Sequence, residues 1–168
     1  MSDTYVECLV KAKPSVIGKF FKILLIVLTV IFVLAFIVVG TLIPYIIVLP
    51  VITGAGAYFV NLYTDLEYEY LYLDKELVID KVMAKSKRKR IGTFSLDRME
   101  ILAPIKSYHL DNFKNRDAKQ SDYSIGEELQ PDLRYVMYYE GGRKIILSPS
   151  AEMIKVMRNT SPRKIYAD

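Results

Sequence analysis

The sequence predicts a membrane-spanning α-helical hairpin followed by one small, mostly β domain that ends in a helix. Three observations lead to this prediction. Residues 23–64 contain no charged residue and no histidine. From residue 66 onward, apolar and polar residues alternate with the period of β-strands. The last apolar stripe has helical spacing instead. We therefore expect three regions, at residues 1–19, 20–64 and 65–168.

The composition excludes several classes of protein. The 168-residue chain has one cysteine, Cys8, so it can form no intramolecular disulfide and no multi-cysteine metal site. Its net charge of +4 is shared between the two ends of the chain and is too small and too dispersed for a nucleic-acid surface. The sequence therefore predicts no cofactor and no nucleic-acid partner. A last region of about 100 residues suits one compact domain.

The uncharged stretch is too long for one crossing of a bilayer. As a straight helix its 42 residues would extend about 63 Å, whereas the hydrocarbon core is about 30 Å thick. Gly40 and Pro44 lie midway and favour a turn. We therefore predict spans at about residues 20–41 and 45–64. Four small residues in the second span allow a close approach to another helix: Gly54, Ala55, Gly56 and Ala57.

The lysines before the first span predict the orientation of the hairpin. Lys11, Lys13, Lys19 and Lys22 precede or begin it, and the turn between the spans has no positive charge. The positive-inside rule then places the N-terminus in the cytoplasm. Because two crossings return the chain to the same side, we expect a cell-membrane protein whose two termini are both cytoplasmic.

The last region begins with an alternating pattern that predicts four strands, at residues 66–73, 76–83, 85–96 and 98–103. Asp74-Lys75 forms the first turn. Glu67 and Glu69 are interpreted as part of a solvated strand face, and a two-acid site is the less favoured interpretation. Residues 105–132 are polar and predicted to be loop, with one short strand at 108–110 or at 123–125.

Gly141-Gly142 predicts a two-residue hairpin loop between strands at 133–140 and 143–147, because glycine tolerates positive φ angles. Glu140 and Arg143 would then face each other across the turn. A helix begins near Ser148-Pro149, since a hydroxyl cap and an early proline precede its apolar stripe. Residues 5–10 are either a short strand at the sheet edge or an amphipathic turn at the membrane surface.

The order of these elements carries a resemblance to a known fold. A meander of strands closed by a hairpin and a C-terminal helix resembles the pleckstrin-homology (PH) superfold, an antiparallel β-sandwich or barrel. Residues 72–80 (YLDKELVID) and 95–101 (SLDRMEI) are similar to bacterial PH-like membrane proteins, in which such a domain follows a pair of transmembrane helices. The chain resembles one family of small bacterial membrane proteins classed as a domain of unknown function, over about residues 20–160. This resemblance implies no functional residues.

A basic run lies between the second and third predicted strands: Lys85, Lys87, Arg88, Lys89 and Arg90. Lys87 and Lys89 would point to one face of a strand and the two arginines to the other, so this segment cannot be buried. Two interpretations remain open. The run contacts anionic lipid headgroups, as basic loops do in other PH domains, or it is an exposed turn that its charge keeps soluble.

The sequence contains no catalytic motif, and its one histidine, His109, is interpreted as a solvated loop residue. The favoured function is therefore a non-enzymatic, membrane-anchored PH-like module that binds lipid or a protein partner. One alternative is an accessory subunit of a larger transporter or envelope-assembly complex, docked through residues 54–57. Another is a membrane-bound enzyme acting at His109, which would require a concave pocket there.

Overall fold

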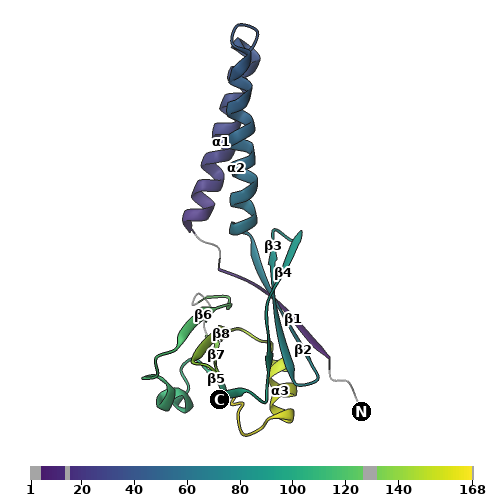
Figure 1. The fold of residues 1–168 in the computed structure, drawn as a ribbon, viewed down its shortest axis with the longest axis vertical. Helices are drawn as coiled ribbons and strands as arrows, with labels where there is room; N and C mark the ends of the chain where they lie inside the picture. Colours follow the sequence, from purple (N-terminus) through teal and green to yellow (C-terminus); the bar gives the residue numbers. More distant parts are fainter. Residues whose placement is uncertain (1–4, 14–15, 127–131, 168) are drawn as a thin grey trace. The chain divides into compact units, whose positions relative to one another are not determined.

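The computed structural model describes residues 5–13, 16–126 and 132–167. The chain forms two compact units, drawn in Figure 1. One unit comprises Pro14–Leu66 and Met83–Ser86 and contains the helical hairpin. The other comprises Met1–Lys13, Glu67–Val82 and Lys87–Asp168 and contains nearly all of the β-structure.

The helical unit has two antiparallel helices joined by a short turn. Helix α1 is Val16–Val39, the 3₁₀ helix η1 is Pro44–Ile47, and α2 is Val48–Thr64. Thus α1 begins four residues before the expected first span, and the expected second span begins as 3₁₀ helix. Pro50 lies in the first turn of α2, where a missing backbone N–H breaks no intrahelical hydrogen bond.

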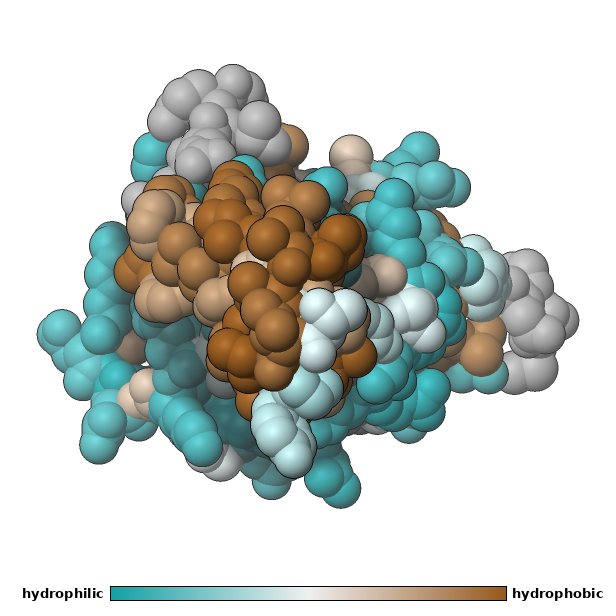
Figure 2. Space-filling model, turned by 90° about the horizontal axis from the view of Figure 1, so that it is seen from above, coloured by the Kyte–Doolittle hydropathy of each residue, from teal (hydrophilic) through white to brown (hydrophobic). Residues whose placement is uncertain are grey.

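The surface of the helical unit is apolar nearly all round. Val16–Val39 and Pro44–Thr64 are each long and apolar enough to cross a membrane. No residue of α1 is buried, and the hydrophobic side chains of the hairpin form the brown surface in Figure 2. An exposed apolar surface of this size is typical of helices that lie in a membrane or against another protein.

The first sheet has four strands in the order β1-β2-β3-β4: Val6–Lys11, Leu66–Leu73, Glu76–Met83 and Lys87–Ser95. Strand β1 pairs antiparallel with β2, with Val6 opposite Tyr72 and Lys11 opposite Glu67. Residues 6–11 are therefore a strand at the sheet edge, the first of the two possibilities left open by the sequence. The helical hairpin is inserted between β1 and β2, so the β domain includes residues from both sides of it.

The second sheet has the order β5-β7-β8-β6: Met99–Pro104, Tyr135–Tyr139, Arg143–Leu147 and Lys119–Asp122. Strand β6 runs parallel to β8, and the other pairs are antiparallel. The short strand predicted at 108–110 or 123–125 is wrong in both positions. Residues 108–113 form the 3₁₀ helix η2 (Tyr108–Phe113), capped by the hydroxyl of Ser107, which accepts from the His109 backbone N–H. Residues 127–131 of the predicted loop lie outside the described part of the chain.

The β7–β8 turn differs from its prediction by one residue. Tyr139 pairs with Arg143, so the loop contains Glu140 as well as Gly141-Gly142, and both glycines have positive φ. The predicted pair of Glu140 with Arg143 is therefore wrong, because the extra loop residue removes Glu140 from the ladder. Its carboxylate lies 3.7 Å from Arg98 Nε, while the Arg143 guanidinium lies 4.7 Å from the centre of the Tyr139 ring.

A hydrophobic core joins the two sheets to helix α3 (Ala151–Thr160). The helix begins two residues after Pro149, and its cap is Ser150, whose hydroxyl accepts from the Met153 backbone N–H at 3.2 Å. Both sheets and the helix contribute fully buried side chains, among them Tyr70, Tyr72, Leu77, Ile79, Leu102, Met137, Ile145, Leu147, Met153 and Met157. These observations confirm the expected class, two apolar helices with a PH-like β-sandwich and a C-terminal helix.

The second sheet is also buried on its other face. A smaller apolar cluster forms there, in which Leu110 of η2 packs with Ile101 of β5, Val136 and Tyr138 of β7, and Ile146 of β8. Helix η2 is thus a third layer over the second sheet.

Candidate functional site

The basic run begins in a tight turn that is bonded to the end of α2. Ala84 and Lys85 both have positive φ, as the two central residues of a two-residue hairpin turn do. The Ser86 backbone N–H donates to the Met83 carbonyl at 3.1 Å, which closes the turn. The Ala84 N–H donates to the carbonyl of Asp65 at 2.7 Å. Since Asp65 is the first residue after α2, the turn is fixed at the exit of the second apolar helix.

The two arginines of the run bind buried acids of the first sheet. Arg88 Nη2 lies 2.9 Å from Glu69 Oε2 on β2, and Arg90 Nε lies 3.3 Å from Asp80 Oδ1 on β3. Glu69 and Asp80 are 7% and 8% exposed, so their charges need these partners. The interpretation of Glu69 as part of a solvated strand face is therefore wrong.

The three lysines of the run, unlike its arginines, pair with no acid among the described residues. Lys85, Lys87 and Lys89 are exposed. Within residues 5–13, 16–126 and 132–167, no ion pair or hydrogen bond involves their side chains. Sequence reasoning located the run and assigned its lysines and arginines to opposite faces, but it did not predict that acids neutralise the arginines. The separation follows from strand alternation, which places the two arginines on one face and Lys87 with Lys89 on the other.

Glu69 also belongs to a pair of carboxyl groups. Burial, its hydrogen bond with Glu7 of β1 and nearby negative charge raise the pKa of Glu69, although Arg88 acts in the opposite direction. The Tyr5 hydroxyl donates to Glu7 Oε2 at 2.7 Å, and this bond, with the one from Glu69, lowers the pKa of Glu7. The hydrogen bond between the two carboxyl groups thus raises the pKa of Glu69 and lowers the pKa of Glu7.

The raised pKa of Glu69 predicts a pH dependence of stability. Above about pH 4.3, the ordinary pKa of a glutamate, unfolded Glu69 loses its proton while folded Glu69 keeps it, so stability falls as the pH rises toward the folded pKa. We expect Glu69→Gln to remove this decline relative to wild type. The lowered pKa of Glu7 affects stability at lower pH, below the ordinary pKa of a glutamate, and there stability rises with pH.

The measurement is the urea midpoint of the full chain in detergent as a function of pH. Glu67→Gln is the matched control, since Glu67 is a glutamate two residues away on the same strand. This variant keeps Glu69, so the decline should persist. Equal slopes for the wild type and Glu69→Gln would contradict the assignment.

The small residues of the second helix lie partly against the first. A Cβ built on Gly54 would lie 3.7 Å from Thr29 Cγ2, and one on Gly56 would lie 3.6 Å from Leu25 Cδ1. The Thr29 and Thr53 hydroxyl oxygens are 3.0 Å apart, which links the helices by a hydrogen bond. The two glycines therefore contact α1 of the same hairpin. Ala55 is exposed and Ala57 half-buried.

His109 lines a concave pocket, as the enzyme alternative requires. The pocket has a volume of about 370 Å³, and Glu100 and Arg163 also line it. However, the imidazole is in contact with two tyrosine rings: it is stacked on Tyr166 at 3.7 Å between ring centres and tilted against Tyr108 at 4.0 Å. Among the described residues, no serine, threonine or cysteine lines this pocket. The described residues also contain no cluster of His, Cys, Asp or Glu that could hold a metal ion.

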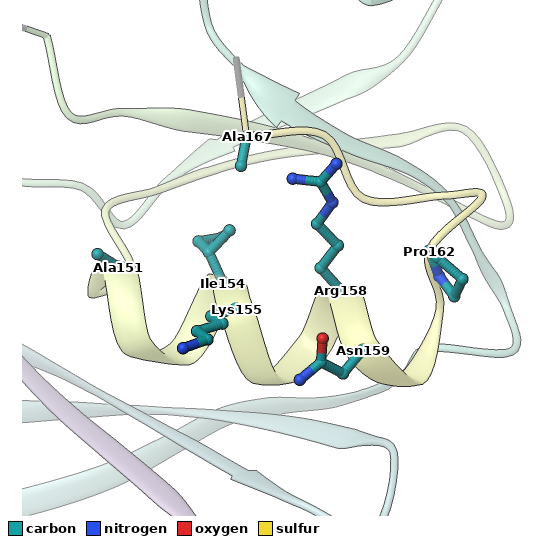
Figure 3. Close-up of a pocket in the computed structure, with 7 residues that line it drawn as sticks. All are labelled: Ala151, Ile154, Lys155, Arg158, Asn159, Pro162 and Ala167. Atoms are coloured by element: carbon teal, nitrogen blue, oxygen red, sulfur yellow. The ribbon is translucent and has the colours of Figure 1, made fainter.

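A second hollow, of about 470 Å³, lies over the outer side of α3 and was not anticipated from the sequence. Figure 3 shows Arg158 reaching from the helix toward Ala167 of the C-terminal tail, with Ile154 beneath. Lys155 and Asn159 complete a polar rim. The i, i+3 spacing of Lys155 and Arg158 was the available signal. Among the described residues, the lining offers cations for an anion but no carboxylate, thiol or imidazole for proton transfer.

Comparison with known proteins gives the family. A family model described as "Bacterial PH-like domain (DUF6106)" matches residues 2–167. The chain belongs to this family. The match to the Bacterial PH-like domain includes β1 and both apolar helices as well as the two sheets, and it confirms the resemblance seen in the sequence. PH-like domains are generally non-catalytic binding modules. No curated protein and no solved structure matches this chain.

Proposed function

We propose that this protein is a non-enzymatic, membrane-anchored binding module. In this proposal α1 and α2 span the cell membrane, and the PH-like domain contacts anionic lipid headgroups at the cytoplasmic face through Lys85, Lys87 and Lys89. The observation that carries the proposal is the Ala84–Asp65 hydrogen bond. It holds the start of the basic run at the end of an apolar helix, where headgroups would lie.

The charges of the hairpin support lipid as the ligand. Glu69 and Asp80 neutralise the two arginines, which leaves three exposed lysines without acids among the described residues. A lysine near an anionic membrane surface contributes about 1 kcal/mol. This attraction is screened within about 8 Å at physiological ionic strength, so only cations held at the membrane surface benefit from it.

Lysine reactivity in lipid nanodiscs tests the proposal. The full chain is required, because β1 precedes the helices and a fragment starting at residue 65 would lack it. We expect acetylation of Lys85, Lys87 and Lys89 to be several-fold slower in phosphatidylglycerol nanodiscs than in phosphatidylcholine nanodiscs, and high salt to abolish the difference. The measurement is mass spectrometry of each modified lysine.

Lys155 is the internal control, because it is exposed on α3 and remote in sequence from the basic run. Its reactivity should be the same in both lipids. Equal reactivity of the three hairpin lysines in both lipids would overturn lipid binding, whereas equal slowing of all exposed lysines would show only a general surface effect and would also overturn it.

The proposed orientation is tested separately with reporters fused to each terminus in living cells. Lys11, Lys13, Lys19 and Lys22 precede or begin α1, so both reporters should be active only in the cytoplasm. A reporter active on the outer side would overturn the two-span topology. Co-isolation of a stoichiometric multi-span partner in mild detergent would instead favour the accessory-subunit alternative.

A further inference from the structure

The four sheet edges of the β domain are not equally protected. An open edge exposes backbone N–H and C=O groups to any extended chain, and natural proteins cover or charge such edges. Strand β4 begins with four basic residues, and β6 has only four residues, all polar. The edge of β5 is covered by the C-terminal tail, since Leu102 N–H donates to Lys164 O at 2.8 Å and Tyr166 N–H donates to Leu102 O at 2.9 Å.

Strand β1 differs from these three edges. It has six residues and no proline, and among the described residues only β2 pairs with it. Its central outward side chain, Leu9, is 56% exposed. An apolar hollow of about 350 Å³ borders its inner side, where Cys8 and Val10 lie with Tyr135 and Pro149. Among the described residues, β1 is therefore the end strand of its sheet, with no further strand beside it and with apolar side chains on both faces.

The side chains of β1 are arranged symmetrically about Leu9. On the outer face Glu7 precedes Leu9 by two residues and Lys11 follows it by two, and all three are exposed. On the inner face Cys8 and Val10 flank the same centre. An identical strand running antiparallel about Leu9 therefore meets opposite charges at both ends and an apolar side chain at every position between them.

We propose that β1 is the interface between two copies of this chain, paired antiparallel about a two-fold axis at Leu9. Glu7 then lies opposite Lys11 of the partner subunit, Leu9 opposite Leu9 of the partner subunit, and Cys8 opposite Val10 of the partner subunit. The two four-stranded sheets become one eight-stranded sheet. Cross-strand pairs of opposite charge and of apolar side chains are the pairs that stabilise antiparallel strands.

Disulfide trapping tests this register in the full chain. The natural cysteine is removed by Cys8→Ser, and Leu9→Cys is added. Residues directly opposite in antiparallel strands have Cα atoms about 4.5–5.5 Å apart, which suits a disulfide. We expect mild oxidation in native membranes to give a disulfide-linked homodimer several-fold faster than in a Cys8→Ser, Thr93→Cys control. Thr93 is also exposed, but it lies on the β4 edge.

Charge reversal supplies a second, independent readout. In the Cys8→Ser, Leu9→Cys background, Glu7→Lys and Lys11→Glu should each slow cross-linking, and the two together should restore it. Loss of the contacts of Glu7 with Tyr5 and Glu69 would not be rescued in this way. Equal rates at positions 9 and 93, no rescue by the double reversal, or cross-linking of residue 9 only to a different protein would each overturn the proposal.

Discussion

The Leu102→Ala variant is expected to lower the free energy of unfolding of the β domain by about 3 kcal/mol. Leu102 lies in β5, is 0% exposed and belongs to the main core. Removing three carbon atoms there forfeits their burial and leaves a cavity that the surrounding β-structure cannot close. The backbone of Leu102 also forms hydrogen bonds with Lys164 and Tyr166 of the C-terminal tail. The tail should therefore be held less tightly on the β5 edge when the core is weakened.

Pulse proteolysis of the full chain in urea measures this loss, because cleavage reports the fraction of β domain that is unfolded. Leu73→Ala is the matched control: it is the same substitution, also in a strand, at a residue that is 37% exposed. It should lower stability by less than about 1 kcal/mol. Similar losses for both variants would show that Leu102 is not part of a close-packed core.

Tyr70→Phe is expected to lower the free energy of unfolding by about 2 kcal/mol. Tyr70 is fully buried on β2, yet its hydroxyl joins two parts of the sandwich. It donates to the Tyr123 carbonyl and accepts from the Ser148 backbone N–H at 3.2 Å. Phenylalanine fills the same space but removes this partner from the carbonyl of the half-buried Tyr123 and from the buried N–H of Ser148. Burial also raises the pKa of Tyr70 well above its ordinary value, so the hydroxyl remains a donor at any physiological pH.

Tyr68→Phe provides the comparison for this variant. Tyr68 lies two residues earlier on the same strand and packs edge-to-face on Tyr123 at 5.4 Å between ring centres. Its hydroxyl makes no hydrogen bond within the described residues, so Tyr68→Phe should change stability by less than about 0.5 kcal/mol. Urea unfolding, monitored by tyrosine fluorescence, measures the stability of both variants. Indistinguishable midpoints for the two variants would contradict the bridging role of Tyr70.

The elements defined by local pattern were predictable. Strands β2 and β3 have the predicted bounds, because apolar residues recur at alternate positions along most of both strands and Asp74-Lys75 separates them. Helix α3 was predicted from its cap and stripe. Strand β6 could not be predicted, since its four residues are all polar and show no apolar pattern. They form a strand only because they pair with β8. The β7–β8 loop was mispredicted by one residue because two adjacent glycines suit more than one loop length.

The candidate site was predictable in position but not in chemistry. The sequence shows the basic run and its alternation, so the exposure of residues 85–90 follows directly. It does not show that Arg88 reaches Glu69, because that pairing depends on the order of β2 and β4 within the sheet. The stacking of Tyr166 on His109 could not be predicted from the sequence either, since the two residues are far apart in the chain. Contacts between distant segments decide which charges remain available.

Because the helical hairpin is inserted between β1 and β2, assembly of the first sheet depends on how the hairpin is placed. In a chain that spans the bilayer, β1 emerges from the ribosome before the helices and has no strand to pair with until β2 follows them. A chain threaded across the membrane only once would leave the two strands on opposite sides, and the first sheet would lack its first member. In such a chain the first sheet can therefore be completed only when two crossings bring β1 and β2 to the same side of the membrane.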